Sequence, residues 1–163
     1  MQINKQNLNI GKAIFEGEIK SCTEGSIIVP DVKPDILKIL QVDAEAFLNE
    51  KNIEDGKLIL SGKVCVNVLY IPESDSNYVQ CIKASFDFCE TLKKTEFEKE
   101  MNVTAFCDVQ RVGYKLINSR KVSFDAQVLI NINVSSEEQV TFICGIEEQT
   151  AELMTDRICI KEA

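Results

Sequence analysis

The strict alternation of side chains in residues 121–134 constrains the fold of this chain more than any other feature. Every even position there is apolar, and every odd position except Leu129 is polar. Successive side chains of a β-strand point to opposite faces of a sheet, so a period of two predicts a strand with one buried face. Further stretches of this pattern occur at 12–20, 41–49, 58–70, 78–88 and 140–146. We therefore expect a mostly β protein.

A change of frame in residues 101–117 predicts an irregular strand. Apolar residues occupy odd positions as far as Val109 and even positions from Val112 onwards. One extra residue in a strand produces this shift, so we expect a β-bulge or a strand break near Gln110 and Arg111.

Clusters of Gly, Asn, Asp and Ser separate the predicted strands and mark turns. They occur at 54–56, 73–77 and 118–119. Long strands joined by such turns favour an antiparallel sandwich-like or barrel-like domain. The one helical segment that we expect is a short turn near 34–40, where Pro34 would occupy the first helical position.

An internal repeat is visible between residues 57–68 and residues 121–132. Each copy starts with Lys, continues with alternating apolar residues and follows a strand and a turn. One interpretation is a pair of related β-hairpin units, 41–72 and 103–134, packed around pseudo-symmetry. The alternative is that half-buried strands simply look alike.

The length of 163 residues is typical of one domain, with room for extensions. We expect an N-terminal arm at 1–10, a β domain at 11–134 and a C-terminal extension at 135–163, packed on the same domain or on a neighbouring subunit. The ends could dock on their own sheet, add a strand to a neighbour's edge, or fray. The apolar candidates for an assembly arm are Ile3, Leu8, Ile10, Leu153 and Ile158.

Acidic residues outnumber basic ones by 26 to 18, which gives a net charge of −8. Nucleic acids and anionic membrane surfaces repel such a chain unless it carries a basic patch, and none is evident. No stretch approaches the roughly 18 apolar residues of a membrane span. The first nine residues are polar and lack the apolar core of a secretion signal. We expect synthesis in a cytosol, no nucleic-acid partner and no membrane insertion.

The chain contains no histidine, which excludes His-based catalytic triads and His-containing metal sites. It also has no Cys-x-x-Cys pair and no glycine-rich phosphate-binding motif. Acids such as Asp31, Asp35 and Asp43 lie along a corner and a strand entry, whereas a glycosidase needs two acids across a cleft. We therefore expect no enzymatic activity, no metal and no cofactor.

Seven cysteines are the most unusual feature of the composition, and an odd number leaves at least one unpaired in a monomer. Cys65 and Cys81 fall on the polar faces of predicted strands, and Cys22 follows a strand into a turn. With Cys159, which lies between two isoleucines, they are candidates for intermolecular disulfides. Three others lie nearer apolar neighbours and are expected in the core: Cys89, Cys107 and Cys144. The alternative is that the thiols stay reduced and act as small apolar side chains.

The first strand leads into a corner made of three residues: Lys33, Pro34 and Asp35. Pro34 fixes its own backbone and restricts the residue before it, which favours a rigid structural corner. A partner-binding surface is the alternative. Arg120 and Lys121 follow the last predicted turn. Either an ion pair with an acid such as Asp35 or Asp43, or an ordinary solvated turn, fits this arrangement.

Residues 28–44 resemble the signature of the SPOCS domain, which occurs in spore-coat and sporulation proteins of clostridia and their relatives. The resemblance rests on the Lys-Pro-Asp-Ile run at 33–36 and the Leu-Gln-Val-Asp-Ala run that follows it. Residues 68–70 are similar to the family's next strand end, and residues 116–122 are similar to its last hairpin. The resemblance covers roughly residues 10–134.

This resemblance implies a structural sporulation protein, made in the mother-cell cytoplasm, that self-assembles into a coat, exosporium or appendage on the spore surface. Its partners would be other copies of itself and other spore-coat proteins, with disulfides as cross-links. Some members carry a carboxy-terminal LysM module and recruit the ATPase of the coat's basement layer, but residues 135–163 are too few for that module. One alternative is an adaptor that binds another coat protein through a sheet edge or the 33–35 corner. Another is a β-domain that holds a small ligand in a cavity.

Overall fold

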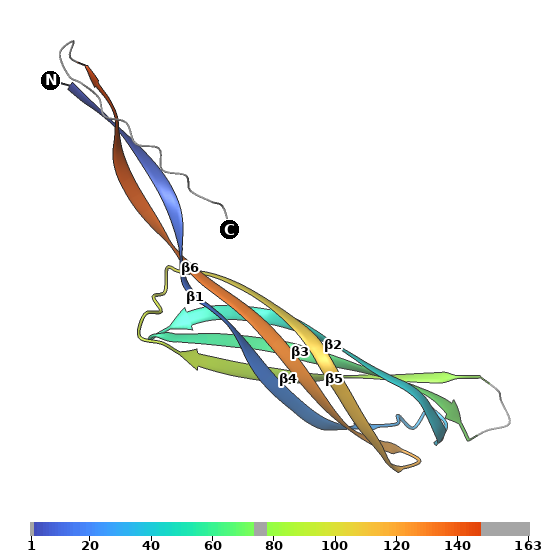
Figure 1. Ribbon diagram of the computed structural model, residues 1–163. Helices are drawn as coiled ribbons and strands as arrows, with labels where there is room; N and C mark the ends of the chain where they lie inside the picture. The colour runs from blue at the N-terminus through green and yellow to red at the C-terminus, as the bar shows by residue number, and fades with distance from the viewer. Residues whose placement is uncertain (1, 74–77, 148–163) are drawn as a thin grey trace. The chain divides into compact units, whose positions relative to one another are not determined.

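The computed structural model describes residues 2–73 and 78–147, with side chains for residues 4–73 and 78–144. These residues form strands and connecting turns, without a helix, as the alternation predicts (Figure 1). The strands are β1 (Gln2–Ile28), β2 (Ile36–Glu54), β3 (Lys57–Pro72), β4 (Gln80–Lys93), β5 (Asn102–Asn118) and β6 (Lys121–Glu147). No helix that could cross a membrane occurs in this part of the chain. Most of the turn expected at 73–77 lies outside the described residues.

The strands form two three-stranded sheets, with the orders β1-β6-β5 and β2-β3-β4 (Figure 1). Neighbours within each sheet are antiparallel, and the central strands are β3 and β6. The two sheets remain separate, so the sandwich-like alternative is confirmed and the barrel-like one is not. The expected hairpins are β2–β3 and β5–β6, and the segments that resemble each other in sequence are the central strands of the two sheets.

The core lies between the two central strands. The even positions of β3 from Leu58 to Tyr70, and those of β6 from Val122 to Val134, are buried. Each fully buried aliphatic side chain contributes about 1.5–3 kcal/mol relative to its exposed state, so these rows supply most of the driving force for folding. The rings of Phe86 and Phe124 meet between the sheets, with centroids 4.5 Å apart. Gly25 on β1 leaves room for them, because a β-carbon there would lie 2.7 Å from both rings.

The short helical turn expected near 34–40 is wrong, because β2 already begins at Ile36. The register of β2 against β3 shifts between Ile36 and Lys38 and again between Ile39 and Gln41. Each bulge adds one residue to the strand. The side chains that reach the core are therefore three positions apart: Ile36, Ile39 and Val42. This spacing is close to the period of a helix, so a twice-bulged strand imitates a helical pattern in the sequence.

Two other local features agree with the sequence. Asp55 and Gly56 join β2 to β3 and have φ angles of 49° and 72°. A type I′ turn requires positive φ at both positions, and its twist matches that of the two strands. The bulge expected near Gln110 is confirmed, because the register of β5 against β6 shifts between Val109 and Arg111.

The chain separates into two compact units. Residues 13–136 form one unit, which contains the sandwich. The other unit combines residues 1–12 with residues 137–163. In its described part, Thr141 Oγ1 donates to Asn7 Oδ1 at 2.9 Å and Cys144 Sγ donates to the Asn4 carbonyl at 3.3 Å. These contacts show that β1 and β6 run in opposite directions there. The division of the chain near residues 10 and 135 stays a prediction.

The alternation can be tested with two matched substitutions on β3. Leu60 is fully buried, whereas the side chain of Leu69 on the outer face is 37% exposed. Leu60→Ala should lower the free energy of unfolding by about 2–5 kcal/mol, because it leaves a cavity between the sheets. Leu69→Ala should lower the free energy of unfolding by well under half of that amount. Urea denaturation of both variants with reductant present measures the difference, and equal losses would contradict the assignment of the two faces.

Candidate functional site

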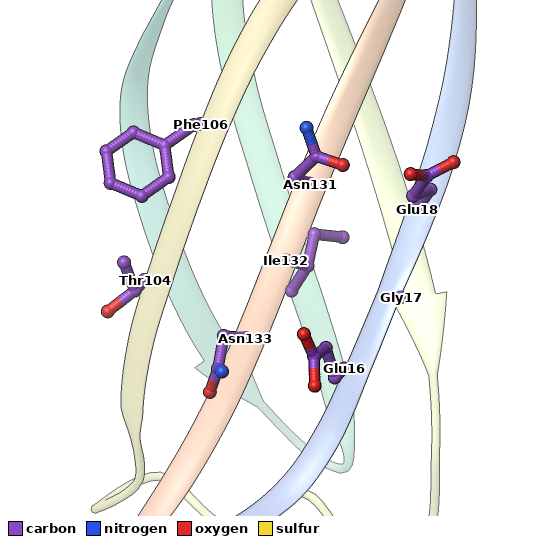
Figure 2. Close-up of a pocket in the computed structure, with 8 residues that line it drawn as sticks. All are labelled: Glu16, Gly17, Glu18, Thr104, Phe106, Asn131, Ile132 and Asn133. Carbon is purple, nitrogen blue, oxygen red and sulfur yellow. The ribbon is translucent and has the colours of Figure 1, made fainter. Parts of the chain in front are cut away.

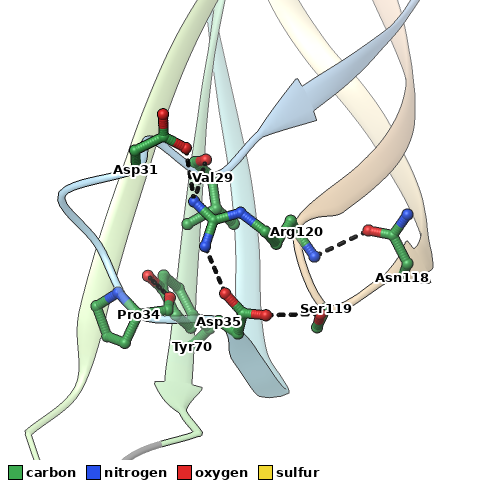
Figure 3. A network of polar contacts seen from close by, with 8 residues as sticks. All are labelled: Val29, Asp31, Pro34, Asp35, Tyr70, Asn118, Ser119 and Arg120. Carbon is green, nitrogen blue, oxygen red and sulfur yellow. Dashed lines mark hydrogen bonds and ion pairs between the residues drawn. The ribbon is translucent and has the colours of Figure 1, made fainter.

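Arg120, in the turn between β5 and β6, reaches the segment that joins β1 to β2 (Figure 3). Its Nη1 atom forms an ion pair with Asp35 Oδ1 at 2.5 Å. Its Nη2 atom donates to the Val29 carbonyl at 3.1 Å and lies 3.3 Å from Asp31 Oδ1. One guanidinium therefore holds three points of the connecting segment.

Further hydrogen bonds join the same two segments. The backbone N–H of Val29 donates to the Arg120 carbonyl at 2.9 Å, and that of Ile36 donates to the Ser119 carbonyl at 2.7 Å. Ser119 Oγ donates to Asp35 Oδ2 at 2.9 Å. We call this group the corner network: Val29, Asp31, Asp35, Ser119 and Arg120. It connects the β1–β2 segment to the β5–β6 turn, and so links the ends of strands from both sheets.

The other two residues of the predicted corner also make contacts within the chain. The Tyr70 hydroxyl donates to the Pro34 carbonyl at 3.0 Å, and the ring of Tyr70 is buried in the core. Lys33 Nζ donates to the Cys81 carbonyl on β4. Lys33, Pro34 and Asp35 thus all form hydrogen bonds or ion pairs with other residues of the sandwich unit. The sequence indicated the corner, but it gave no sign that Tyr70 and Ser119 complete it.

Asp35, and not Asp43, is the acid that pairs with Arg120. Asp43 accepts a hydrogen bond from Gln41 Nε2 at 2.6 Å instead. The hydrogen bonds from Ser119 and then from Arg120 lower the pKa of Asp35 below its usual 3.8, and the charge of Arg120 adds to them. Partial burial opposes this shift. The network therefore favours the charged form of Asp35.

Three cysteines lie on the outer face of the β2-β3-β4 sheet: Cys65, Cys81 and Cys89. They occupy odd positions of strands whose even positions face the core. Their cross-strand neighbours are Ser85, Leu69 and Ser61, respectively. Cys65 Sγ lies 3.4 Å from Ser85 Oγ. Cys65 and Cys81 are half-buried, and Cys89 is exposed.

The remaining thiols differ in accessibility. Cys22 is exposed, and Cys159 lies outside the described residues. Cys89 and Cys144 were expected in the core, and that prediction is wrong because both are exposed. Cys89 occupies an odd position of β4, and this alternation places its side chain on the outer face even though apolar residues lie near it in the sequence. Cys107 is half-buried and packs against the core, and burial raises the pKa of its thiol.

The candidate assembly arms are only partly described. Leu8 is exposed and Ile10 is half-buried, both on β1. The side chains of the other three candidates lie outside the described residues: Ile3, Leu153 and Ile158. Three exposed apolar side chains on β6 are not among these candidates: Val140, Phe142 and Ile143. They belong to the 140–146 alternation, which predicts a strand with one covered face, whereas side chains on both faces are exposed in the described part of this segment.

A shallow hollow lies on the outer face of the β1-β6-β5 sheet (Figure 2). Its lining consists of Glu16, Gly17, Glu18, Thr104, Phe106, Asn131, Ile132 and Asn133. The two glutamates and Phe106 are exposed, so water screens the charges of the carboxylates. Among the described residues, no group of three or more Cys, Asp and Glu side chains is placed to hold a metal ion. No local pattern in the sequence predicts the hollow, because three segments that are far apart in the chain form it.

Comparison with known proteins gives one family. A family model described as "SipL, SPOCS domain" matches residues 35–117, which is just over half of the chain. The match begins at Asp35 in the corner network and runs from β2 to the end of β5. No curated protein and no solved structure matches the chain.

The corner network should make stability depend on acid. Because the pKa of Asp35 is lowered in the folded state, its contribution is present above the unfolded value near 3.8 and is lost as the pH falls through the folded value. Asp35→Asn should therefore melt at a lower temperature than the unchanged chain at pH 6, and the gap should narrow toward pH 2. Thermal melts across this range measure it. Asp43→Asn is the matched control, and a gap of constant size would contradict the assignment.

Exposure should also rank the thiols by reactivity. Cys22, Cys89 and Cys144 should react with a maleimide faster than Cys107, because the nucleophile is the thiolate and Cys107 is half-buried with a raised pKa. Timed labelling of the reduced chain, followed by peptide mass spectrometry, gives the order. Fast labelling of Cys107 in the folded chain would contradict its placement against the core.

Proposed function

We propose that this chain, which belongs to the SipL SPOCS domain family, is a structural subunit and self-assembles on the spore surface. Membership of this family indicates a sporulation-related protein. The assembly would be a coat layer, an exosporium or an appendage, built after synthesis in the mother-cell cytoplasm. Its partners would be further copies of the chain and other spore-coat proteins, and disulfides would cross-link it. We propose no catalytic role.

The surface thiols are the observation that carries this proposal. All six cysteines in the described part of the chain are free, and three of them are exposed. Exposed thiols are a liability for a soluble monomer, because they invite uncontrolled oxidation. In a subunit that leaves a reducing compartment, the same thiols become points of covalent attachment between copies.

The register of β3 and β4 supports bonds between copies rather than within one. A disulfide needs Cα atoms about 4.4–6.8 Å apart. Each of Cys65, Cys81 and Cys89 faces a serine or a leucine on the neighbouring strand, so no two of them are cross-strand neighbours. Disulfides through these three positions therefore need a thiol from elsewhere, and a second copy supplies one without rearranging the sheet.

The unit that contains the two ends supports assembly independently. Leu8, Val140, Phe142 and Ile143 are exposed on paired segments of β1 and β6. In the described part of this unit β1 and β6 pair with each other alone, and a two-stranded pair is marginally stable in water. Contact with a neighbouring copy would cover these side chains, which is the role proposed for the arms.

An adaptor remains the second candidate, and the free side of β4 is the observation that favours it. β4 is the last strand of its sheet order, so an extended segment of any partner could pair with it. An adaptor should stay soluble and uniform at high concentration, and it should tolerate replacement of its exposed cysteines. The self-assembling subunit should do neither.

Negative-stain electron microscopy of the purified chain, beside non-reducing gel electrophoresis, tests the proposal. Without reductant we expect regular sheets, tubes or fibres and a ladder of covalent oligomers that reductant removes. Replacing Cys22, Cys65 and Cys81 together with Ser should shorten the ladder. Cys107→Ala is the matched control and should leave it intact.

Two results would change the proposal. A uniform small particle that runs as a monomer with and without reductant would overturn self-assembly and favour the adaptor. Ordered assemblies that form equally well in reductant would keep self-assembly and remove the thiols from it.

A further inference from the structure

Strand β4 (Gln80–Lys93) has an open side. It follows β3 in the order β2-β3-β4 and ends that sheet. Every strand at the end of a sheet presents a row of backbone N–H and C=O groups that can pair with another chain. The exposures of Ala84 and Phe86 agree with this position, because both face inward but are only half-buried. The comparable positions of the central strand β3 are fully buried.

The sequence of β4 is complementary to itself when it is read in both directions from Ser85. Ala84 mirrors Phe86, and Lys83 mirrors Asp87. Ile82 mirrors Phe88, and the two cysteines mirror each other as Cys81 and Cys89. Each mirrored pair thus joins two small or apolar residues, two opposite charges or two thiols. Two antiparallel copies of β4 centred on Ser85 would place every residue opposite its mirror.

The faces of the strand agree with this pairing. Odd positions of β4 point outward and even positions point toward the core. Lys83, Asp87 and both thiols therefore lie on the outer face, where lysine can meet aspartate and thiol can meet thiol across two copies. The apolar pairs lie on the inner face, where they extend the core. Cross-strand pairs of these kinds are the units that stabilise a sheet.

We propose that β4 pairs antiparallel with β4 of a second copy about a two-fold axis at Ser85, and that Cys81 of each copy forms a disulfide with Cys89 of the other. This pairing would join the β2-β3-β4 sheet of one copy to the same sheet of the other copy and make one continuous sheet. The axis makes the interface isologous, so the same contacts occur twice. The inference rests on the proposed self-assembly and names one of its contacts.

Distances favour this disulfide between copies and exclude it within one. Residues directly opposite each other in an antiparallel pair have Cα atoms about 4.5 or 5.5 Å apart, within the range that a disulfide accepts. Cys81 and Cys89 of the same strand are about 27 Å apart at ~3.4 Å per residue. The Cys81 carbonyl already accepts a hydrogen bond from Lys33 Nζ, but a carbonyl has two lone pairs and can accept another from the partner strand.

The mirrored pairs also select the register. A shift by two residues in one direction sets Lys83 opposite a cysteine and Ile82 opposite Glu90. The opposite shift sets Cys81 opposite Asp87 and Cys89 opposite Val79. Only the register centred on Ser85 aligns both thiol pairs and both charge pairs. Asp87 also lies 3.9 Å from Lys63 of its own chain, but that pair is exposed and weak, and leaves the carboxylate free to meet Lys83 of the second copy.

Disulfide formation requires an oxidant, and we assign this role to a small-molecule disulfide such as oxidised glutathione. The Cys89 thiol loses its proton to solvent, and its thiolate attacks one sulfur of the oxidant. One small thiol is released, and a mixed disulfide is left on Cys89. The thiolate of Cys81 from the other copy then attacks the Cys89 sulfur and displaces the second small thiol. Each bridge oxidises two protein thiols and reduces one small disulfide to two thiols.

A complementation experiment on the full chain tests the pairing. Cys81→Ser and Cys89→Ser each lack one half of every proposed bridge, so neither variant alone should form it. An equal mixture should form it, because Cys89 of the first variant meets Cys81 of the second. After oxidised glutathione is added, we expect this bridge in the mixture to be at least about tenfold more abundant than any other disulfide that joins the two variants, since pairing holds the thiols together. Chymotrypsin cleaves after Tyr70, Tyr78, Phe86 and Phe88 and so places Cys65, Cys81 and Cys89 in separate peptides. Mass spectrometry of the unreduced peptides therefore identifies the bridge.

Charge reversal supplies a second test that does not depend on replacing cysteines. Lys83→Asp would set two carboxylates opposite each other and should slow formation of the Cys81–Cys89 bridge about two- to fivefold at low salt. Adding Asp87→Lys to that variant should restore the rate. Lys38→Asp on β2, on the far side of the same sheet, is the matched control and should have no effect.

The outcomes separate this inference from the proposed function. Ordered assemblies whose bridges never join Cys81 to Cys89, with no rescue in the mixture, would overturn the β4 pairing and leave self-assembly in place. A chain that stays monomeric with and without oxidant would overturn both. A bridge that forms in the mixture and responds to both charge reversals would establish the pairing.

Discussion

The inner faces of β3 and β6 pack against each other, and the other described features of the sandwich depend on that contact. Both strands bury every even side chain over a long stretch, because each lies at the centre of its own sheet. A three-stranded sheet with one apolar face cannot stay in water with that face open. Each sheet is therefore the cover for the other, and the outer faces remain available for thiols and charges.

Packing alone does not fix the position of the β1–β2 segment relative to the β5–β6 turn, and the corner network does so. The hydrophobic effect has no direction, so two apolar faces can slide over each other at little cost. Arg120 removes that freedom, because its guanidinium holds Asp35 and the Val29 carbonyl at once. The adjoining backbone bonds fix the two segments at single positions. Pro34 and the buried Tyr70 then anchor the corner to the core.

The sequence predicts the strands and their buried faces well, because a period of two is a local property that each segment carries by itself. It fails at Ile36–Val42, where two bulges give the apolar side chains the spacing of a helix. It names Asp35 and Asp43 as partners for Arg120 but cannot choose between them, because the choice depends on how segments far apart in the chain meet. Cys89 was placed in the core from its neighbours in sequence, although its position on β4 puts it on the outer face.

The mirror pattern of β4 also shows that a local sequence pattern can be interpreted only when the arrangement of the strands is known. The mirrored residues around Ser85 can be read directly from the sequence. A self-complementary strand can pair with a second copy only if one of its two edges is free, however. Only the strand order shows that β4 ends its sheet. Under the proposed pairing, a thiol meets its counterpart only when the register is correct, so oxidation would fix correct contacts and leave shifted ones reversible. Non-covalent pairing would then choose the arrangement, and the disulfide would preserve it after the reductant is lost.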